Sequence, residues 1–104
     1  YFWLSESALC NNINAELKAL YERYHGDGFE VYHVSADGDI AQWVEAVRQQ
    51  GHPWISVYGG ANADVFTLFN VQQLPMAYII DRDGNINHTS LALDELEREI
   101  KRRL

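Results

Sequence analysis

Apolar residues recur at helical spacing in three long stretches of the chain. The first stretch, about residues 7–24, predicts a helix that His25 to Gly28 end. The second, about 39–50, ends at Gly51, and the third spans about 93–104. The stripes expected to face a core are Leu9, Cys10, Ile13, Leu17, Leu20, Tyr21 and Tyr24; then Ile40, Trp43, Val44 and Val47; then Leu93, Leu96, Ile100 and Leu104.

Shorter apolar runs between these helices predict strands. Residues 1–4 are typical of the end of a buried strand, residues 29–35 of a second strand with Val31 and Val34 in the core, and 76–80 of another. Residues 52–58 predict a short edge strand, because Pro53 is disfavoured in a sheet centre. Asp83-Gly84 predicts a hairpin turn into an antiparallel strand over 86–89, and about 62–69 predicts a short helix that buries Val65, Phe66 and Phe69.

This order of elements predicts an α/β fold. Parallel β-α-β units followed by a hairpin and a closing helix imply a central mixed sheet of about four to five strands with helices on both faces. At 104 residues the chain is expected to form a single domain, residues 1–104. The bulky opening Tyr1-Phe2-Trp3 is typical of the middle of a strand, so we expect a truncated first strand and a chain excised from a longer one.

The net charge of −7 argues against nucleic-acid binding, which requires a basic face. The sequence holds no apolar run near 18 residues, so no membrane span is expected, and it leaves the oligomeric state open. The histidines show no metal-ligand spacing, and no glycine-rich phosphate loop occurs, so neither a metal nor a cofactor is expected. The one cysteine, Cys10, cannot form an internal disulfide.

Cys10 is the one residue with candidate covalent chemistry. It falls in the first turn of the first predicted helix, where the electropositive helix start favours a thiolate. Ser5 or Ser7 can cap that helix. Two features favour a plain buried residue instead: Cys10 lies on the apolar stripe, and the nearby carboxylate of Glu6 opposes thiolate formation.

The segment Phe2-Trp-Leu-Ser-Glu-Ser-Ala-Leu-Cys-Asn11 resembles the active-site segment F-W-A-S-W-C-x-x-C-R of thioredoxin-like proteins of the TlpA/ResA type, which are related to AhpC/TSA proteins. Residues 17–24, 28–37, 69–76 and 78–85 are similar to the same family, so the resemblance covers nearly the whole chain. It implies a thioredoxin-like fold and a thiol-disulfide oxidoreductase ancestry. It also implies an extracytoplasmic location, in the bacterial periplasm or envelope.

In this alignment Ser7 stands where the family has its attacking cysteine, Cys10 at its resolving cysteine and Glu6 at its tryptophan. Thiol-disulfide exchange needs two sulfurs, so the motif is degenerate and a redox-inactive binding or scaffold module is expected. Ile13 replaces a family glutamate that handles protons, which agrees with this reading. Two alternatives stay open: a single-cysteine redox enzyme using Cys10, either monothiol or peroxiredoxin-like with Ser7-x-x-Cys10, and a plain structural domain.

Leu74-Pro75-Met76 resembles the family's cis-proline loop. The resemblance implies a cis bond before Pro75 and a protein or peptide segment bound beside it, with Trp3 and Glu6 as further binding candidates. By periodicity alone, Trp43 is expected in the core, Trp3 beneath the first helix, and Trp54 in the core.

Overall fold

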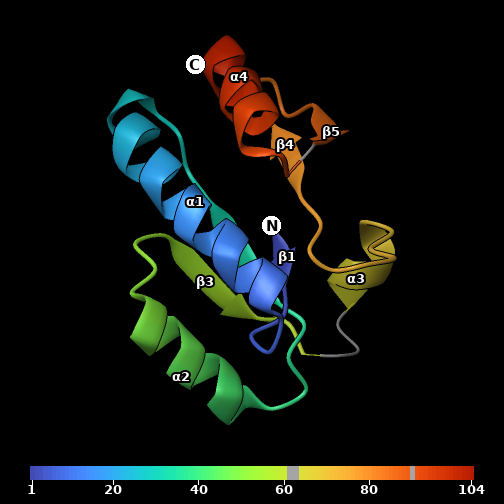
Figure 1. Cartoon of the computed structure of the whole chain (residues 1–104). Helices are drawn as coiled ribbons and strands as arrows, with labels where there is room; N and C mark the ends of the chain where they lie inside the picture. The colour runs from blue at the N-terminus through green and yellow to red at the C-terminus, as the bar shows by residue number, and fades with distance from the viewer. Residues whose placement is uncertain (61–63, 90) are drawn as a thin grey trace.

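The computed structural model describes residues 1–60, 64–89 and 91–104. Its elements follow the predicted order (Figure 1). They are β1 (Phe2–Trp3), α1 (Ala8–Tyr24), the 3₁₀ turn η1 (His25–Asp27), β2 (Tyr32–Ser35), α2 (Ile40–Gln50), β3 (Ile55–Tyr58), α3 (Asp64–Leu68), β4 (Tyr78–Ile80), β5 (Ile86–His88) and α4 (Leu93–Arg103).

The strands form a three-stranded parallel sheet in the order β1-β2-β3 and a two-stranded antiparallel sheet of β4 and β5, and an isolated bridge links the two. β1 pairs in parallel with β2, β2 in parallel with β3, and β4 antiparallel with β5. The N–H of Phe2 donates to the carbonyl of Met76 at 2.8 Å, and the N–H of Met76 donates back at 3.2 Å. This bridge joins the two parts in the order β3-β2-β1-β4-β5, which is the predicted mixed sheet of four to five strands.

Side-chain alternation along β1 separates the two faces of the sheet. Trp3 is buried on the face that α1 covers, and the core of this face also includes Leu96 and Ile100 of α4. Phe2 points to the opposite face, where its ring lies 5.6 Å from that of Phe66 and 5.7 Å from that of Phe69. Helices therefore lie on both faces, although α3 covers only part of the second one.

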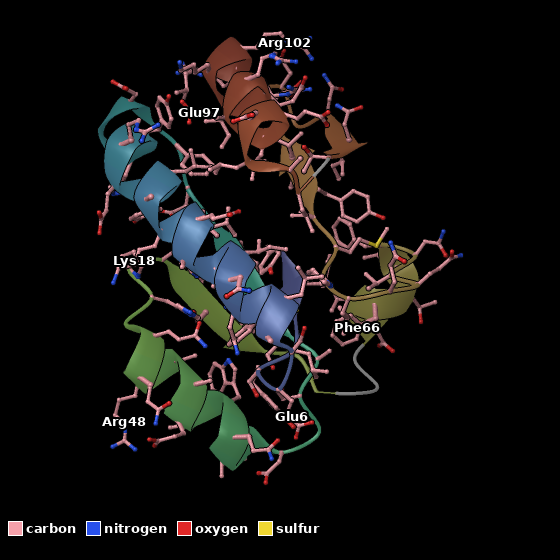
Figure 2. All side chains as sticks on the ribbon, in the orientation of Figure 1. Glu6, Lys18, Arg48, Phe66, Glu97 and Arg102 are labelled. Carbon is pink, nitrogen blue, oxygen red and sulfur yellow. The ribbon has the colours of Figure 1, made fainter. Side chains whose placement is uncertain are left out.

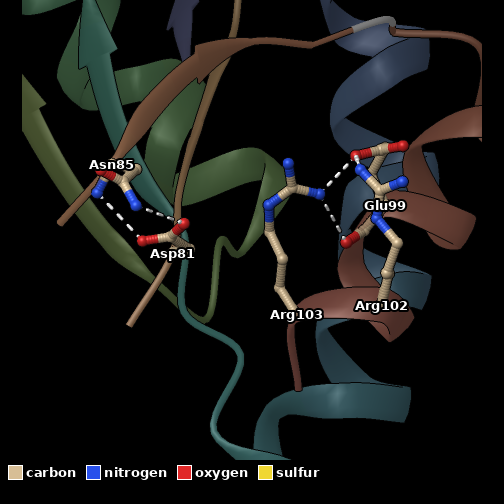
Figure 3. Close-up of polar contacts among 5 residues, drawn as sticks. All are labelled: Asp81, Asn85, Glu99, Arg102 and Arg103. Atoms are coloured by element: carbon tan, nitrogen blue, oxygen red, sulfur yellow. Dashed lines mark hydrogen bonds and ion pairs between the residues drawn. The ribbon is translucent and has the colours of Figure 1, made fainter. Parts of the chain in front are cut away.

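Local signals in the sequence set the limits of the elements. Ser7 caps α1, and Asp39 caps α2 by accepting from the N–H of Ala41 at 2.9 Å. Gly51 ends α2 with a φ of 61°, a left-handed conformation that glycine adopts readily. In the β4–β5 turn, Asp81 accepts from the backbone and side-chain N–H groups of Asn85 (Figure 3).

Two ion pairs of α4 join residues of the helix itself. Glu99 accepts from Arg102 at 2.9 Å and also from Arg103 (Figure 3). The acidic and basic side chains of these pairs lie at the surface of α4, where each ion pair contributes little to stability.

Several residues expected in the core are exposed. Trp43 and Val47 of α2 and Val65 and Phe66 of α3 are half-buried. The helical period identifies the apolar face, but α2 lies at the β3 edge, where Trp43 contacts Tyr58 and leaves much of that face open. The exposed residues are Leu9, Ile40, Val44, Leu93 and Leu104.

The strands are shorter than predicted. Residues 29–31 precede β2, and Met76 contributes only its bridge. The expected start of the short helix at Asn62 lies outside the described residues. Within the described ranges, no helix combines the length and hydrophobicity needed to cross a membrane.

Candidate functional site

The N-terminus of α1 presents Ser7 and Cys10 at the candidate site. Ser7 Oγ accepts a hydrogen bond from the N–H of Cys10 at 3.2 Å, which satisfies one of the free donors of the helix start. The Ser7 hydroxyl is therefore engaged as a cap, and the Cys10 side chain is fully buried at 0% exposure. A thiolate must be accessible from solvent to attack a disulfide or peroxide, and the buried side chain of Cys10 is not accessible.

A buried carboxylate fixes the corner that leads into α1. Asp37 Oδ1 accepts from the backbone N–H of Ser5 at 2.9 Å and from its hydroxyl at 2.8 Å, while Oδ2 accepts from the hydroxyl of Ser35 at 2.6 Å. Asp37 is 1% exposed, so these bonds are what make its burial tolerable. From the sequence alone, Ala36-Asp37-Gly38-Asp39 is expected to form a turn that also caps the following helix, with no further role for Asp37. The signal that could have identified Asp37 is the Ser35-x-Asp37 pattern, because polar side chains are common at the carboxyl ends of parallel strands.

The proline loop lies beside β1. The Leu74–Pro75 peptide bond is cis, the isomer that the resemblance implies. Because Met76 pairs with Phe2 antiparallel, the register places Pro75 opposite Trp3, at the entrance to the corner. Leu74, Pro75 and Met76 are half-buried and retain surface that a partner can reach.

Two of the expected binding residues differ in their exposure to solvent. Glu6 is exposed at the corner before α1 (Figure 2). Trp3 has 0% exposure and cannot touch a partner, so its place among the binding candidates is corrected. Its indole lies under α1 because alternation along β1 turns it inward, and it supports the site from below.

Beneath the site, Trp3 belongs to a group of packed rings around His33. The His33 ring centroid lies 4.8 Å from Trp3, 4.9 Å from His52, 5.0 Å from Trp54 and 4.6 Å from Tyr1. Both ring nitrogens of His33 are buried, and among the described side chains neither has a hydrogen-bond partner. We call Tyr1, Trp3, His33, His52 and Trp54 the ring cluster.

Burial keeps both histidines of the ring cluster neutral. Desolvation lowers the pKa of His33 to about 2, and electrostatic interaction with His52 and with the Tyr1 amino group adds to this effect. Desolvation, followed by repulsion from Lys18, lowers the pKa of His52 to about 4. His52 Nε2 lies 2.7 Å from Gln50 Oε1. The sequence predicted no such meeting, because 19 positions separate the two histidines.

Two arginines, Arg23 and Arg48, form ion pairs with carboxylates rather than with the thiol. Arg23 pairs with Glu97 at 2.8 Å, and Arg48 pairs with Glu45 of its own helix. A peroxiredoxin-like mechanism needs a cation beside the attacking sulfur, and these two guanidiniums are engaged elsewhere. Over the part of the chain that the structure describes, histidine, cysteine and carboxylate side chains form no group of three that could hold a metal ion.

A mixed sheet, a helix that starts directly after its central strand, and a cis-proline loop beside that start define a thioredoxin-fold domain. Residues 1–86 match a family model described as thioredoxin-like. The chain belongs to the thioredoxin-like family. No curated protein sequence matches it.

Several of the similar solved structures are Bacteroides proteins, or domains of them, described as thiol-disulfide oxidoreductases. The thioredoxin domain of one from Bacteroides vulgatus is 23% identical with a TM-score of 0.86, over 97% of this chain and 74% of that one. One from Bacteroides fragilis is 24% identical with a TM-score of 0.86, over 99% and 77%. A C-terminal domain assigned to this class from Bacteroides thetaiotaomicron is 27% identical with a TM-score of 0.86, over 98% and 72%. These likenesses support the thioredoxin-like fold of the chain.

Proposed function

We propose that this domain is a redox-inactive binding or scaffold module that has lost the attacking cysteine of its family. One observation carries the proposal: Ser7, at the attacker's position, is engaged as a helix cap, while the thiol of Cys10 is fully buried. Disulfide exchange requires a thiolate that attacks and a second sulfur that resolves the mixed disulfide. A serine hydroxyl supplies neither function.

The partner in this proposal is an extended protein or peptide segment held at the Pro75 loop. Leu74 and Pro75 lie opposite the end of β1 and are only half-buried, so their backbone can pair with an added extended segment. Glu6 and Leu9 are exposed at the start of α1 and lie next to the capped corner in sequence. The site therefore offers backbone pairing together with one negative and one apolar side chain.

A single-cysteine enzyme is the alternative. It requires Cys10 to meet a disulfide or peroxide, and burial of its side chain opposes this. A plain structural domain is the third candidate, and the free surface at Leu74 and Pro75 favours a binding role over it. We also propose that residues 1–104 form a single domain that acts outside the cytoplasm, in the periplasm or envelope, on the basis of the family resemblance.

Insulin reduction under limiting dithiothreitol tests the proposal. The unaltered chain is expected to show no rate above the dithiothreitol background. Ser7→Cys restores the C-x-x-C spacing at the helix start and is expected to produce catalysis, because the introduced thiol lies one turn from Cys10. Ala8→Cys is the matched control: it adds a thiol to the same exposed turn at the wrong spacing, and it should stay at background.

Measurable catalysis by the unaltered chain, at a rate close to that of Ser7→Cys, would show that Cys10 alone suffices and would remove the proposal. Labelling by 5,5′-dithiobis(2-nitrobenzoate) gives an independent reading. Native Cys10 should react far more slowly than Cys10 in urea-unfolded protein, because the native side chain is fully buried.

A further inference from the structure

The strand directions gather several loops at one end of the molecule. β1, β2 and β3 run in parallel, so the segments that follow them leave from the same edge. Met76 pairs antiparallel with Phe2, so the segment that leads through Pro75 into β4 reaches this edge as well. We call this surface the carboxyl-end face. It is formed by residues 4–9, 36–40, 59–60 and 64–76.

Every charged residue described on the carboxyl-end face is acidic. Glu6, Asp39 and Asp64 are exposed there, whereas Asp37 is buried in its bonds to the corner. Figure 2 shows Glu6 and Arg102 at opposite ends of the molecule. The eight lysines and arginines of the chain lie on later turns of α1 and α2, on the β4–β5 turn and on α4: Lys18, Arg23, Arg48, Arg82, Arg98, Lys101, Arg102 and Arg103.

Ion pairs compensate acidic side chains on other parts of the surface. Glu97 pairs with Arg23 at 2.8 Å, and similar pairs lie within α2 and α4. Among the described residues, neither Glu6 nor Asp64 has a cationic partner. The negative potential of the carboxyl-end face is therefore left for a molecule that docks there.

Apolar side chains accompany these carboxylates. Leu9 in the first turn of α1 is 58% exposed, and Leu68 of α3 is 81% exposed. Leu74 and Met76, on the two sides of Pro75, are half-buried. A partner that fits this surface offers positive charge to the carboxylates and apolar side chains to the leucines.

We propose that the segment docking at the Pro75 loop is cationic: an extended stretch of a partner polypeptide that carries lysine or arginine side chains together with apolar ones. This inference rests on the proposed function and deepens it, because it adds the chemistry of the partner to the place of docking. Backbone pairing holds the segment, and charge complementarity selects it and speeds its encounter with the face. An anionic segment is repelled by the same carboxylates.

Three synthetic peptides of equal length test the charge preference. The probe is acetyl-Lys-Val-Lys-Val-Lys-Val-amide, and its neutral and anionic counterparts carry threonine or glutamate in place of lysine. Titrations are followed by the amide NMR signals of Leu74 and Met76. At about 0.01 M salt the lysine peptide is expected to bind about tenfold more tightly than the threonine peptide, since each exposed charge pair contributes up to about fivefold. The glutamate peptide should bind more weakly than either.

Salt separates charge attraction from backbone pairing. Between about 0.01 M and 1 M salt the screening length falls from ~30 Å to ~3 Å. The lysine and threonine peptides should therefore bind with nearly equal affinity at the higher concentration, because the backbone contribution alone remains.

Single substitutions locate the attraction on the carboxyl-end face. Glu6→Gln and Asp64→Asn should each weaken binding of the lysine peptide about two- to fivefold at low salt. Glu22→Gln is the matched control: Glu22 is exposed near the far end of α1, so its removal changes the net charge equally and should leave binding unchanged.

Four results would overturn the inference. Equal affinity of the lysine and threonine peptides at low salt would remove the cationic preference and leave the docking role of the Pro75 loop intact. An equal loss in Glu22→Gln would show general attraction to an acidic protein. Salt-sensitive self-association that moves the Leu74 and Met76 signals would assign the face to a second copy of the chain. If no peptide moves these signals at millimolar concentration, the docking role itself fails together with this inference.

Discussion

Replacing His33 by phenylalanine should remove most of the acid sensitivity of this domain. His33 is fully buried among the rings of the ring cluster, and its two nitrogens have no partner among the described side chains. Its pKa is lowered to about 2 by burial, so the folded state holds it neutral throughout the ordinary pH range. An unfolded chain binds a proton at this residue below about pH 6.5.

The direction of the change in stability with pH follows from the number of protons that the folded and unfolded states bind. Below pH 6.5 the unfolded state binds more protons than the folded state, so the free energy of unfolding falls as the pH falls toward the folded pKa. Between pH 7.5 and pH 5 one such histidine costs ~2 kcal/mol of stability. His52, whose folded pKa is about 4, adds ~1 kcal/mol after a discount for its partial exposure. The unaltered domain should therefore lose ~3 kcal/mol in this interval, a large part of a stability of about 5–15 kcal/mol.

Urea unfolding at pH 7.5 and at pH 5, followed by tryptophan fluorescence, measures this loss. His33→Phe keeps an aromatic ring in the same space and should reduce the loss to ~1 kcal/mol, the share of His52. Trp54→Phe is the matched control, because it alters a ring in contact with both histidines without removing a titrating group. It should lower stability equally at both pH values. An unchanged pH dependence in His33→Phe, or an equal change in Trp54→Phe, would refute the reasoning.

Three further substitutions test single contacts, each by the shift in free energy of unfolding in urea. Ser7→Ala should cost ~1 kcal/mol by removing the cap of α1, and Ser7→Asp should restore most of it. Asp37→Ala should cost about 3 kcal/mol, since it leaves buried donors unpaired, whereas Asp39→Ala removes an exposed cap and should cost only ~1 kcal/mol. Gly59→Ala places a methyl group 2.7 Å from a backbone carbonyl oxygen of β2 and should cost about 2 kcal/mol or more, while Gly26→Ala meets nothing within 4 Å and should be near neutral. Equal effects in either matched pair would contradict the contact analysis.

The sequence predicted the positions of helices and strands better than it predicted which of their residues are buried. α1 was predicted almost to the residue, because its period, its serine cap and its glycine-containing stop all agree. The same period marked Ile40 and Val44 of α2 as core, yet both are exposed. Periodicity tells which face of a helix is apolar, whereas burial depends on whether another element reaches that face. At the outer edge of β3, Trp43 packs against Tyr58, while Ile40 and Val44 stay exposed.

The supporting parts of the site were beyond sequence reasoning for a related reason. Asp37 was assigned to a turn, although it binds Ser5 across 32 positions. His33 and His52 were judged scattered, yet they meet under α1 at 4.9 Å. Such contacts arise from the parallel alignment of β1, β2 and β3 and leave no spacing signal along the chain. Cys10 was placed on the buried stripe correctly, because its helix supplied a local signal.

These contacts also bear on the proposed function, because they show how the fold could persist without thiol chemistry. The corner before α1 is held by Asp37 and by the Ser7 cap, and no sulfur takes part in either contact. In the proposed module, absence of an attacking thiol would therefore remove electron transfer without removing a bond that shapes the site. A serine at this position even adds a capping interaction worth ~1 kcal/mol. The geometry that holds a partner and the thiol that reduces it are thus separable, which is the physical condition for a binding module to remain after catalysis is lost.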